Sequence, residues 1–397
     1  MQKNLEKKGV RSSVVTIALM LFTSHAGGGF ATGNQANTWF VGLGTMGILS
    51  SIIALMLLCL LLRYAFIIYN REGHESYKEF FKSLYRPFDN LYIVFEVFFN
   101  IMVIMVVATT ISGASSALLE FLGINYRLAS ILVSLIILVL SIFGASLVRK
   151  LSAIMGIVIL IASLSIYIVG IPMGDSIFEI VRTDLSTNGY NNLGKAVFNG
   201  FVYAGFQCVQ IPAMLAVCSV LKTEREASKS MGLAFVINAL ALGLSVVMLL
   251  SWQSYYTSVD QGMTLPTLTV TKAMGYEWMS VFYAISLILC LISSGISIIF
   301  GFVSRFEDID LLSSIKSVKL RRLLVAGFAI GVSTLISFFG ITNIIKYGYG
   351  YCGYVAIVFI VIPIIVIGAY RNRKVKINKY AYQLAYVRNK KRGENEI

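Results

Sequence analysis

The segment HAGGGFATGNQ (His25–Gln35) lies in the middle of the first long apolar run of the chain, residues 13–40. Three successive glycines are poor helix formers, because each costs about 1 kcal/mol relative to alanine in a helix interior. In hydrocarbon the freed backbone groups cannot face lipid. The segment therefore predicts a helix that is interrupted near mid-membrane and lines a polar cavity. Close helix packing through the GxxxG spacing of Gly29 and Gly33 is the alternative interpretation.

The composition places the whole chain in a membrane. Of 397 residues, 57% are hydrophobic and 13% are charged, whereas soluble domains carry about 25% charged residues. The apolar runs are about 20 residues long, which predicts helices rather than a β-barrel. We predict an all-α polytopic protein with ten membrane-spanning helices, at 13–40, 43–68, 91–121, 128–148, 151–171, 195–221, 229–254, 278–304, 322–340 and 345–369.

The basic residues predict the orientation. With the N-terminus inside, 28 of the 33 Lys and Arg residues fall on the inner side, as the positive-inside rule requires. We therefore expect a multi-pass protein of the cell membrane with both termini in the cytoplasm. Because these charges lie at the ends of apolar runs, the net charge of +14 does not indicate a nucleic-acid partner. No signal-peptide cleavage site follows the first run.

A second interruption is expected in the sixth span. Asn199–Gln207 is glycine-rich and is followed by Pro212. The sixth span opens the second of two five-helix halves, residues 13–171 and 195–369, which form one transporter domain with a cytoplasmic tail at 370–397. Interrupted helices at matching places in two halves are typical of inverted-repeat secondary transporters, with the binding site at the breaks.

The arrangement resembles a known superfamily. Five plus five helices with breaks in the first and sixth resemble the LeuT-fold superfamily of amino acid, polyamine and organocation transporters. The segment GGFATGNQ (Gly28–Gln35) is similar to that of the YkvI-type bacterial membrane proteins, as are SGASS (Ser112–Ser116) and FNGFVYAGFQ (Phe198–Gln207). The resemblance covers essentially all ten spans, with His25 before the glycines as a departure. It implies the fold and a transport role.

A small zwitterion, an amino acid or a related amine, is the expected solute. The half-helix that begins near Gly28 offers unpaired amides and a positive dipole end, which favour a carboxylate. The expected substrate-binding residues lie on the first, third and sixth spans: Gly27, Gly28, Gly29, Phe30, Thr109, Ser112, Tyr203, Gly205, Phe206 and Gln207.

The resemblance also implies a sodium site. In sodium-coupled members of the LeuT fold, adjacent hydroxyls on the eighth helix join carbonyls of the first and eighth helices around Na⁺. Ser293 and Ser294 match the hydroxyls, and the carbonyls would come from Cys290 and from near Ser24 and Gly27. Oxygen ligands suit a hard cation. Alternatively, these serines bond their own helix backbone.

Two ionisable residues in the membrane keep proton coupling open. His25 lies beside the first break and Glu96 lies one turn from the inner end of the third span. Such groups are functional candidates by default, and imidazole titrates near neutral pH. A structural, hydrogen-bonded imidazole and a carboxylate that reaches the interface are the alternatives.

No enzymatic motif accompanies these features. The chain lacks a phosphate-binding loop, a nucleophile–base pair and paired acids or histidines at the interface, and no organic cofactor is indicated. We therefore expect an ion-coupled secondary transporter of a small solute that uses Na⁺ or H⁺. A transporter-like, ligand-sensing receptor without net transport is the alternative.

Overall fold

The structure is a computed structural model that describes residues 2–143, 145–306 and 314–374. Within these ranges it contains helices and no β-strand. The prediction of an all-α polytopic membrane protein is confirmed. The long helices are α1 (Gln2–His25), α4 (Thr45–Glu72), α6 (Tyr92–Leu122), α7 (Tyr126–Phe143), α8 (Ala145–Met173), α10 (Leu193–Phe206), α12 (Glu224–Ser251), α15 (Glu277–Phe306), α16 (Val318–Ser337) and α19 (Ile362–Lys374).

The candidate spans coincide in position with the predicted ones. Eight helical stretches in the described part of the chain are long and apolar enough to cross a membrane, and two shorter apolar helices cover Ser13–His25 and Tyr126–Ile142. The last stretch is built from α17 (Ile341–Asn343), a π-helical turn (Ile344–Tyr349), α18 (Gly350–Ala356), a second π-helical turn (Ile357–Val361) and α19. The inverted repeat stays a prediction.

Short helices occupy the polar connections between the long helices. They are α5 (Tyr77–Leu84), α9 (Ile177–Asn188), α13 (Gln253–Ser258) and α14 (Pro266–Ala273). A capping box starts α5, because the Glu79 amide donates to Ser76 Oγ and the Glu79 carboxylate accepts from the Glu75 amide. Pro266 is the first residue of α14, a position where its missing N–H costs nothing.

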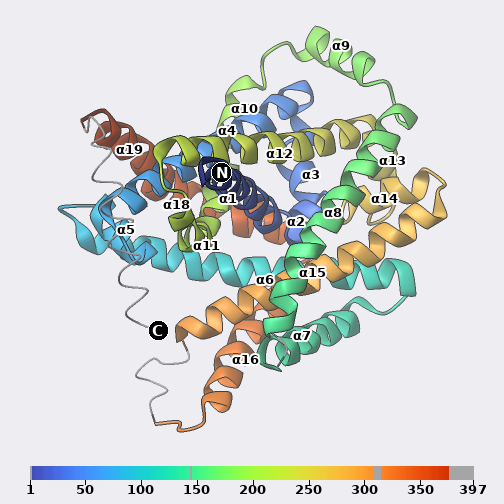
Figure 1. Cartoon of the computed structure of the whole chain (residues 1–397). Coiled ribbons are helices and arrows are strands. Elements are labelled where there is room, and N and C mark those ends of the chain that lie inside the picture. The colour runs from blue at the N-terminus through green and yellow to red at the C-terminus, as the bar shows by residue number, and fades with distance from the viewer. Residues whose placement is uncertain (1, 144, 307–313, 375–397) are drawn as a thin grey trace.

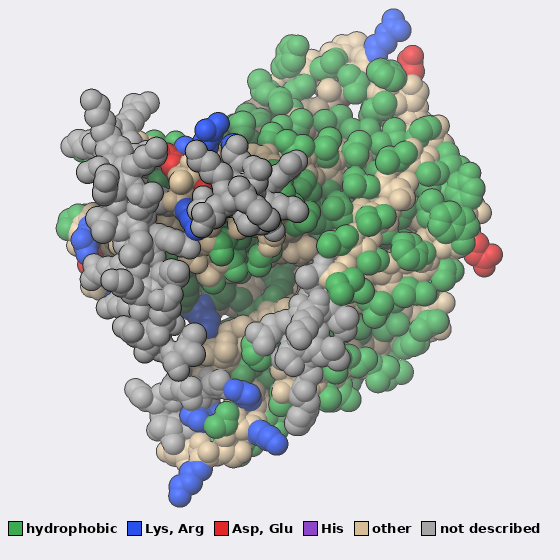
Figure 2. Space-filling view, viewed as in Figure 1, with side chains coloured by type: hydrophobic (Ala, Val, Ile, Leu, Met, Phe, Trp, Pro, Cys, Tyr) green, Lys and Arg blue, Asp and Glu red, His purple; other side chains and the backbone are tan. Residues whose placement is uncertain are grey.

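The helices form two packed groups that meet along α8. The first group contains α1, α4, α10 and α12, and the second contains α6, α7, α15 and α16, while α8 packs on both α12 and α15 (Figure 1). Hydrophobic side chains cover much of the surface in Figure 2, as a lipid-facing surface requires. One cavity lies between the two groups and is lined by residues of both, whereas a second is lined by α6, α7 and the segments 255–272 and 339–343.

The orientation can be tested with single cysteines at Ser258 on α13 and at Lys78 on α5, which are both exposed. We expect a membrane-impermeant maleimide applied to intact cells to label Ser258→Cys and not Lys78→Cys, because the basic residues place α5 inside. The unsubstituted protein is the control, since four of its five cysteines are buried. Labelling of Lys78→Cys from outside would refute the predicted orientation.

Candidate functional site

The first span is interrupted twice, not once. The first helix, α1, ends at His25, α2 (Gly28–Ala31) is a single turn, and α3 begins at Asn34 and ends at Trp39. Gly33 lies between α2 and α3 with a φ of 79°, and a Cβ there would lie 2.2 Å from the Thr267 hydroxyl. This position therefore needs glycine. Because α2 is so short, its dipole is small, and individual amides would have to attract a carboxylate.

The sixth span is irregular but not opened. The helix α10 continues through a 3₁₀ turn at Gln207–Gln210 into α11 (Ile211–Val217). The irregularity therefore begins at the last residue of the predicted segment Asn199–Gln207, which is otherwise regular helix. This corrects the predicted break: Pro212, which lies in the first turn of α11, is tolerated there without opening the helix.

A buried hydrogen-bonded chain starts at His25, at the end of α1. His25 Nδ1 lies 2.8 Å from Asn238 Oδ1 on α12, and His25 Nε2 lies 2.7 Å from the Tyr203 hydroxyl on α10. Tyr203 in turn donates to Gln35 Oε1 at 2.8 Å. All four side chains are at most 5% exposed. The chain joins both sides of the first break to α10 and α12.

A cavity of about 580 Å³ reaches this break from one side. It begins at Ser24, His25, Gly27, Gly29 and Gln35, and extends to Tyr77 of α5 and Arg305 at the end of α15. Figure 2 shows a hollow near the middle of the face toward the viewer. The end of the cavity at α5 lies on the predicted cytoplasmic side.

Most of the expected substrate residues lie in or next to this cavity. Its wall includes Gly27, Gly29, Phe206 and Gln207, while Gly28 begins α2. Three others lie one layer behind: Phe30 packs on the His25 ring, Tyr203 bonds to His25 and Gln35, and Thr109 bonds at 2.8 Å to Tyr349, which lines the cavity. Four further residues in or next to the cavity were not among the expected ones: Gln35, Asn238, Gln210 and Tyr349.

Two expected substrate residues lie elsewhere. Ser112 bonds at 2.7 Å to the Tyr126 hydroxyl, which lines a different cavity. A Cβ on Gly205 would lie 2.7 Å from the Gly353 carbonyl oxygen. Gly205 therefore allows α10 to approach α18 closely, which is the packing role of small residues in membrane helices.

The expected sodium ligands lie where α15 passes the first break. Cys290 Sγ lies 3.7 Å from the Ala26 carbonyl oxygen, and Ser293 Oγ donates to the Cys290 carbonyl at 3.1 Å. Ser294 lies beside the Cys290 thiol. The carbonyl of the first span that contacts this thiol is that of Ala26, and the expected contributions of Ser24 and Gly27 stay a prediction. Among the described residues, no group of three or more His, Cys, Asp or Glu could hold a metal ion.

Glu96 has a partner that the sequence analysis did not identify. Its carboxylate lies 2.6 Å from Arg305 Nη2 on α15, and the Arg305 guanidinium also contacts the Tyr77 hydroxyl and stacks 4.5 Å from the centre of the Phe99 ring. The ion pair links α15 to α6, and the contact of Arg305 with Tyr77 links α15 to α5, at the end of the cavity that Tyr77 and Arg305 line.

The segment between α12 and α15 covers the other side of the break; it is called the lid below (residues 252–276, with α13 and α14). Asn34 Nδ2 lies within 3.1 Å of two lid carbonyls, those of Met263 and Thr264, and 2.8 Å from the Thr342 hydroxyl. Tyr256 donates to Asn37 at 2.8 Å. These bonds close the site on the predicted outer side.

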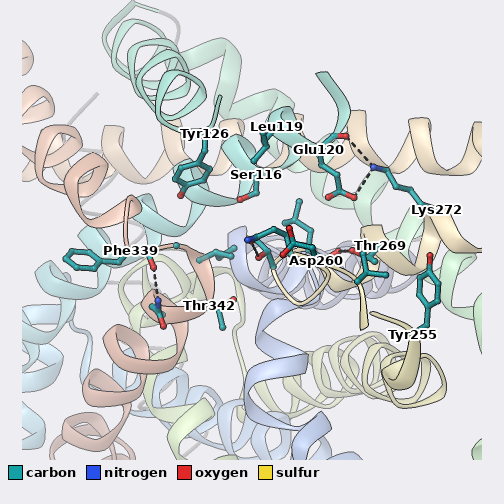
Figure 3. Close-up of a pocket in the computed structure, with 17 residues that line it drawn as sticks. Ser116, Leu119, Glu120, Tyr126, Tyr255, Asp260, Thr269, Lys272, Phe339 and Thr342 are labelled. Atoms are coloured by element: carbon teal, nitrogen blue, oxygen red, sulfur yellow. Dashed lines mark hydrogen bonds and ion pairs between the residues drawn. The ribbon is translucent and has the colours of Figure 1, made fainter. Parts of the chain in front are cut away.

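A second cavity, of about 740 Å³, lies beyond the lid contacts and shares no lining residue with the first. Figure 3 shows Glu120 of α6 and Lys272 of α14 pointing toward each other at this cavity, where Lys272 Nζ lies 3.0 Å from the Glu120 carboxylate. This ion pair holds α14 of the lid to α6.

The comparisons with known proteins agree on the fold. No family model and no curated protein matches the chain. A crystal structure of a manganese transporter from Eremococcus coleocola superimposes with a TM-score of 0.52 at 13% identity, covering 96% of this chain and 92% of that one. A Na⁺-coupled sialic acid symporter in an outward-open state gives a TM-score of 0.53 at 15% identity, covering 92% and 97%. The chain therefore shares the all-α polytopic fold of these two proteins.

Proposed function

We propose that this chain is a secondary transporter that moves a small solute across the membrane by alternating access. One observation carries the proposal: a cavity reaches the interrupted first span from one side, while the lid closes it from the other. A site that is open to one side only is what alternating access requires, since access must pass from one side to the other. The similarity of fold to known transporters supports the same function.

The proposed solute is an amino acid or a related amine. The cavity wall combines apolar side chains such as Met102 and Phe206 with the amides of Gln35, Gln207 and Gln210. A mostly apolar site with a few polar groups is typical of small-molecule recognition. We also propose that the chain is related to the YkvI-type membrane proteins, which its segment Gly28–Gln35 resembles.

The test is uptake by purified protein in liposomes. We expect accumulation of at least one member of a panel of radiolabelled amino acids and polyamines when a Na⁺ or pH gradient is imposed. Protein-free liposomes are the control. Solute binding without uptake under either gradient would refute transport and favour the ligand-sensing receptor.

Na⁺ is the first candidate for the coupling ion, and H⁺ acting through His25 is the second. Cys290 of α15 meets the first break at the Ala26 carbonyl, and Ser293 donates to the Cys290 carbonyl of its own helix. Replacing Ser293 and Ser294 by alanine is expected to raise the Na⁺ concentration for half-maximal uptake about tenfold or more, because two oxygen ligands are lost. A tenfold change corresponds to about 1.4 kcal/mol.

Ser304→Ala is the matched control, since Ser304 lies on the same helix, is exposed and, among the described residues, bonds only the Gly301 carbonyl. We expect its Na⁺ dependence to equal that of the unsubstituted protein. Full uptake in Na⁺-free buffer under a pH gradient would refute the sodium assignment and support the proton.

A further inference from the structure

The cavity at the first break carries a fixed charge at its far end. Among the described residues that line it, Arg305 is the only Asp, Glu, Lys or Arg. Arg305 is separated from Cys290, which contacts the first break, by about four turns of α15, or roughly 22 Å along the helix. An arginine side chain stays protonated in proteins. The cavity therefore presents a permanent positive charge at the end that lies on the predicted cytoplasmic side.

The ion pair with Glu96 leaves part of the Arg305 guanidinium unused. Arg305 Nη2 lies 2.6 Å from Glu96 Oε2 and also contacts the Tyr77 hydroxyl. Arg305 Nη1 and Glu96 Oε1 are buried, and among the described residues neither has a hydrogen-bond partner. The ion pair is thus a single contact and not the stronger bidentate arrangement. Because a buried donor without an acceptor is costly, the guanidinium gains from a second acceptor.

The surroundings of the guanidinium suit an acceptor that is attached to an apolar group. Arg305 Cζ lies 4.5 Å from the centre of the Phe99 ring and 5.0 Å from that of the Tyr77 ring, contacts in which aromatic rings attract and orient a cation. Tyr77, Phe99 and Phe302 line the same cavity, whereas Glu96 is not among the described residues that line it. A solute in the cavity therefore meets the guanidinium and the aromatic side chains rather than the Glu96 carboxylate.

We propose that Arg305 forms a second binding site in this cavity, which takes the carboxylate of the solute on its path between the cytoplasm and the first break. A positive charge between apolar walls concentrates anions and repels cations. The solute is thereby narrowed to a small molecule with a carboxylate on an apolar group, such as an apolar amino acid, and polyamines are disfavoured. This inference rests on the proposed transport of a small solute.

Protection of a cysteine in the cavity tests the proposal. Ala213 on α11 is exposed and lines the cavity, so Ala213→Cys in full-length protein in nanodiscs should react with the neutral reagent N-ethylmaleimide. The probes are benzoate, benzylamine and benzamide, which share one ring and are anionic, cationic and neutral, respectively, at neutral pH. We expect benzoate to halve the labelling rate at a concentration roughly tenfold or more below that of the other two probes. The protein without the added cysteine gives the background, since four of its five cysteines are buried.

Two variants in this background separate solute binding by Arg305 from its role in the ion pair. In Arg305→Gln the preference for benzoate over benzylamine should fall below about threefold, because the positive charge is lost. In Glu96→Gln the guanidinium keeps its charge and loses a competing carboxylate. Benzoate should then protect at a concentration roughly threefold lower than with Glu96 in place.

If Arg305 served only to link α15 to α6, both variants would break the same ion pair and change the protection alike, and that result would overturn the proposal. Equal protection by the three probes in Ala213→Cys alone would overturn it too. Arg305→Lys covers a folding failure of Arg305→Gln, because it keeps the charge but not the planar fork. There benzoate should protect more weakly yet stay preferred, and a lost preference would also contradict the proposal. The readout is protection and not uptake, so its failure is distinct from a failure of transport.

Discussion

Replacing Asn34 with alanine is expected to open the predicted outer side of the protein. Asn34 is fully buried and its Nδ2 group is within hydrogen-bonding distance of two lid carbonyls and the Thr342 hydroxyl. Each buried acceptor left without a donor costs about 1–3 kcal/mol. We therefore expect the ratio of closed to open lid to fall roughly 30- to 150-fold, which corresponds to about 2–3 kcal/mol.

Labelling of a cysteine on the buried side of the lid measures this change. Leu268 on α14 is fully buried, so Leu268→Cys should react with an impermeant maleimide only when the lid lifts. We expect Asn34→Ala to raise that rate roughly 30-fold or more. Asn343→Ala is the matched control, because Asn343 lines the second cavity but, within the described part of the chain, bonds only the Phe339 carbonyl. Equal labelling rates in the two variants would show that Asn34 does not hold the lid.

The first break could be predicted from sequence because its cause is local. Glycine destabilises a helix wherever it occurs, so three successive glycines within an apolar run predict an interruption of the helix. The second interruption, at Gly33, could not be predicted, because it depends on Thr267 in the lid, more than 200 residues away. The sixth span was predicted less well, because Gly200 and Gly205 lie within a regular helix and serve close packing instead. A Cβ on Gly200 would meet Ile53, and a Cβ on Gly205 would meet Gly353.

The partners of the polar residues were beyond the reach of the sequence. His25 and Glu96 could be singled out, because an ionisable group in an apolar run is conspicuous. Their partners Asn238, Tyr203 and Arg305 lie 178 to 213 residues away along the chain. Local spacing carries no information on such pairs.

Helical spacing alone also could not show that Ser112 lies away from the cavity at the first break. Thr109 and Ser112 are three residues apart and so share a helix face, which made either suitable for the site. In the structure they lie at different heights along α6. Thr109 bonds Tyr349, which lines the first cavity, whereas Ser112 bonds Tyr126, which lines the second. Depth depends on where the lid closes, and that is a tertiary feature.

Gly29→Ala is expected to weaken solute binding far more than Gly27→Ala, although both glycines line the same cavity. A Cβ on Gly29 would lie 2.5 Å from Gln35 Nε2 and 2.6 Å from Gln35 Cγ. The whole Gln35 side chain must then move, and its bond to Tyr203 is lost. Overpacking of this kind costs about 1–3 kcal/mol, so we expect the solute concentration for half-maximal uptake to rise roughly 5- to 150-fold.

The matched control is Gly27→Ala, because the nearest atom to its Cβ is the Ser24 carbonyl oxygen at 3.9 Å, an ordinary contact. Uptake in liposomes should change less than about threefold in this variant, which is under 1 kcal/mol. A double-mutant cycle identifies the cause. If Gly29 acts by leaving room for Gln35, Gly29→Ala should add little to Gln35→Ala, because the side chain that it displaces is already gone. Additive effects would instead mean that Gly29 serves the packing of the first span, and the glycine cluster would then be no part of the binding site.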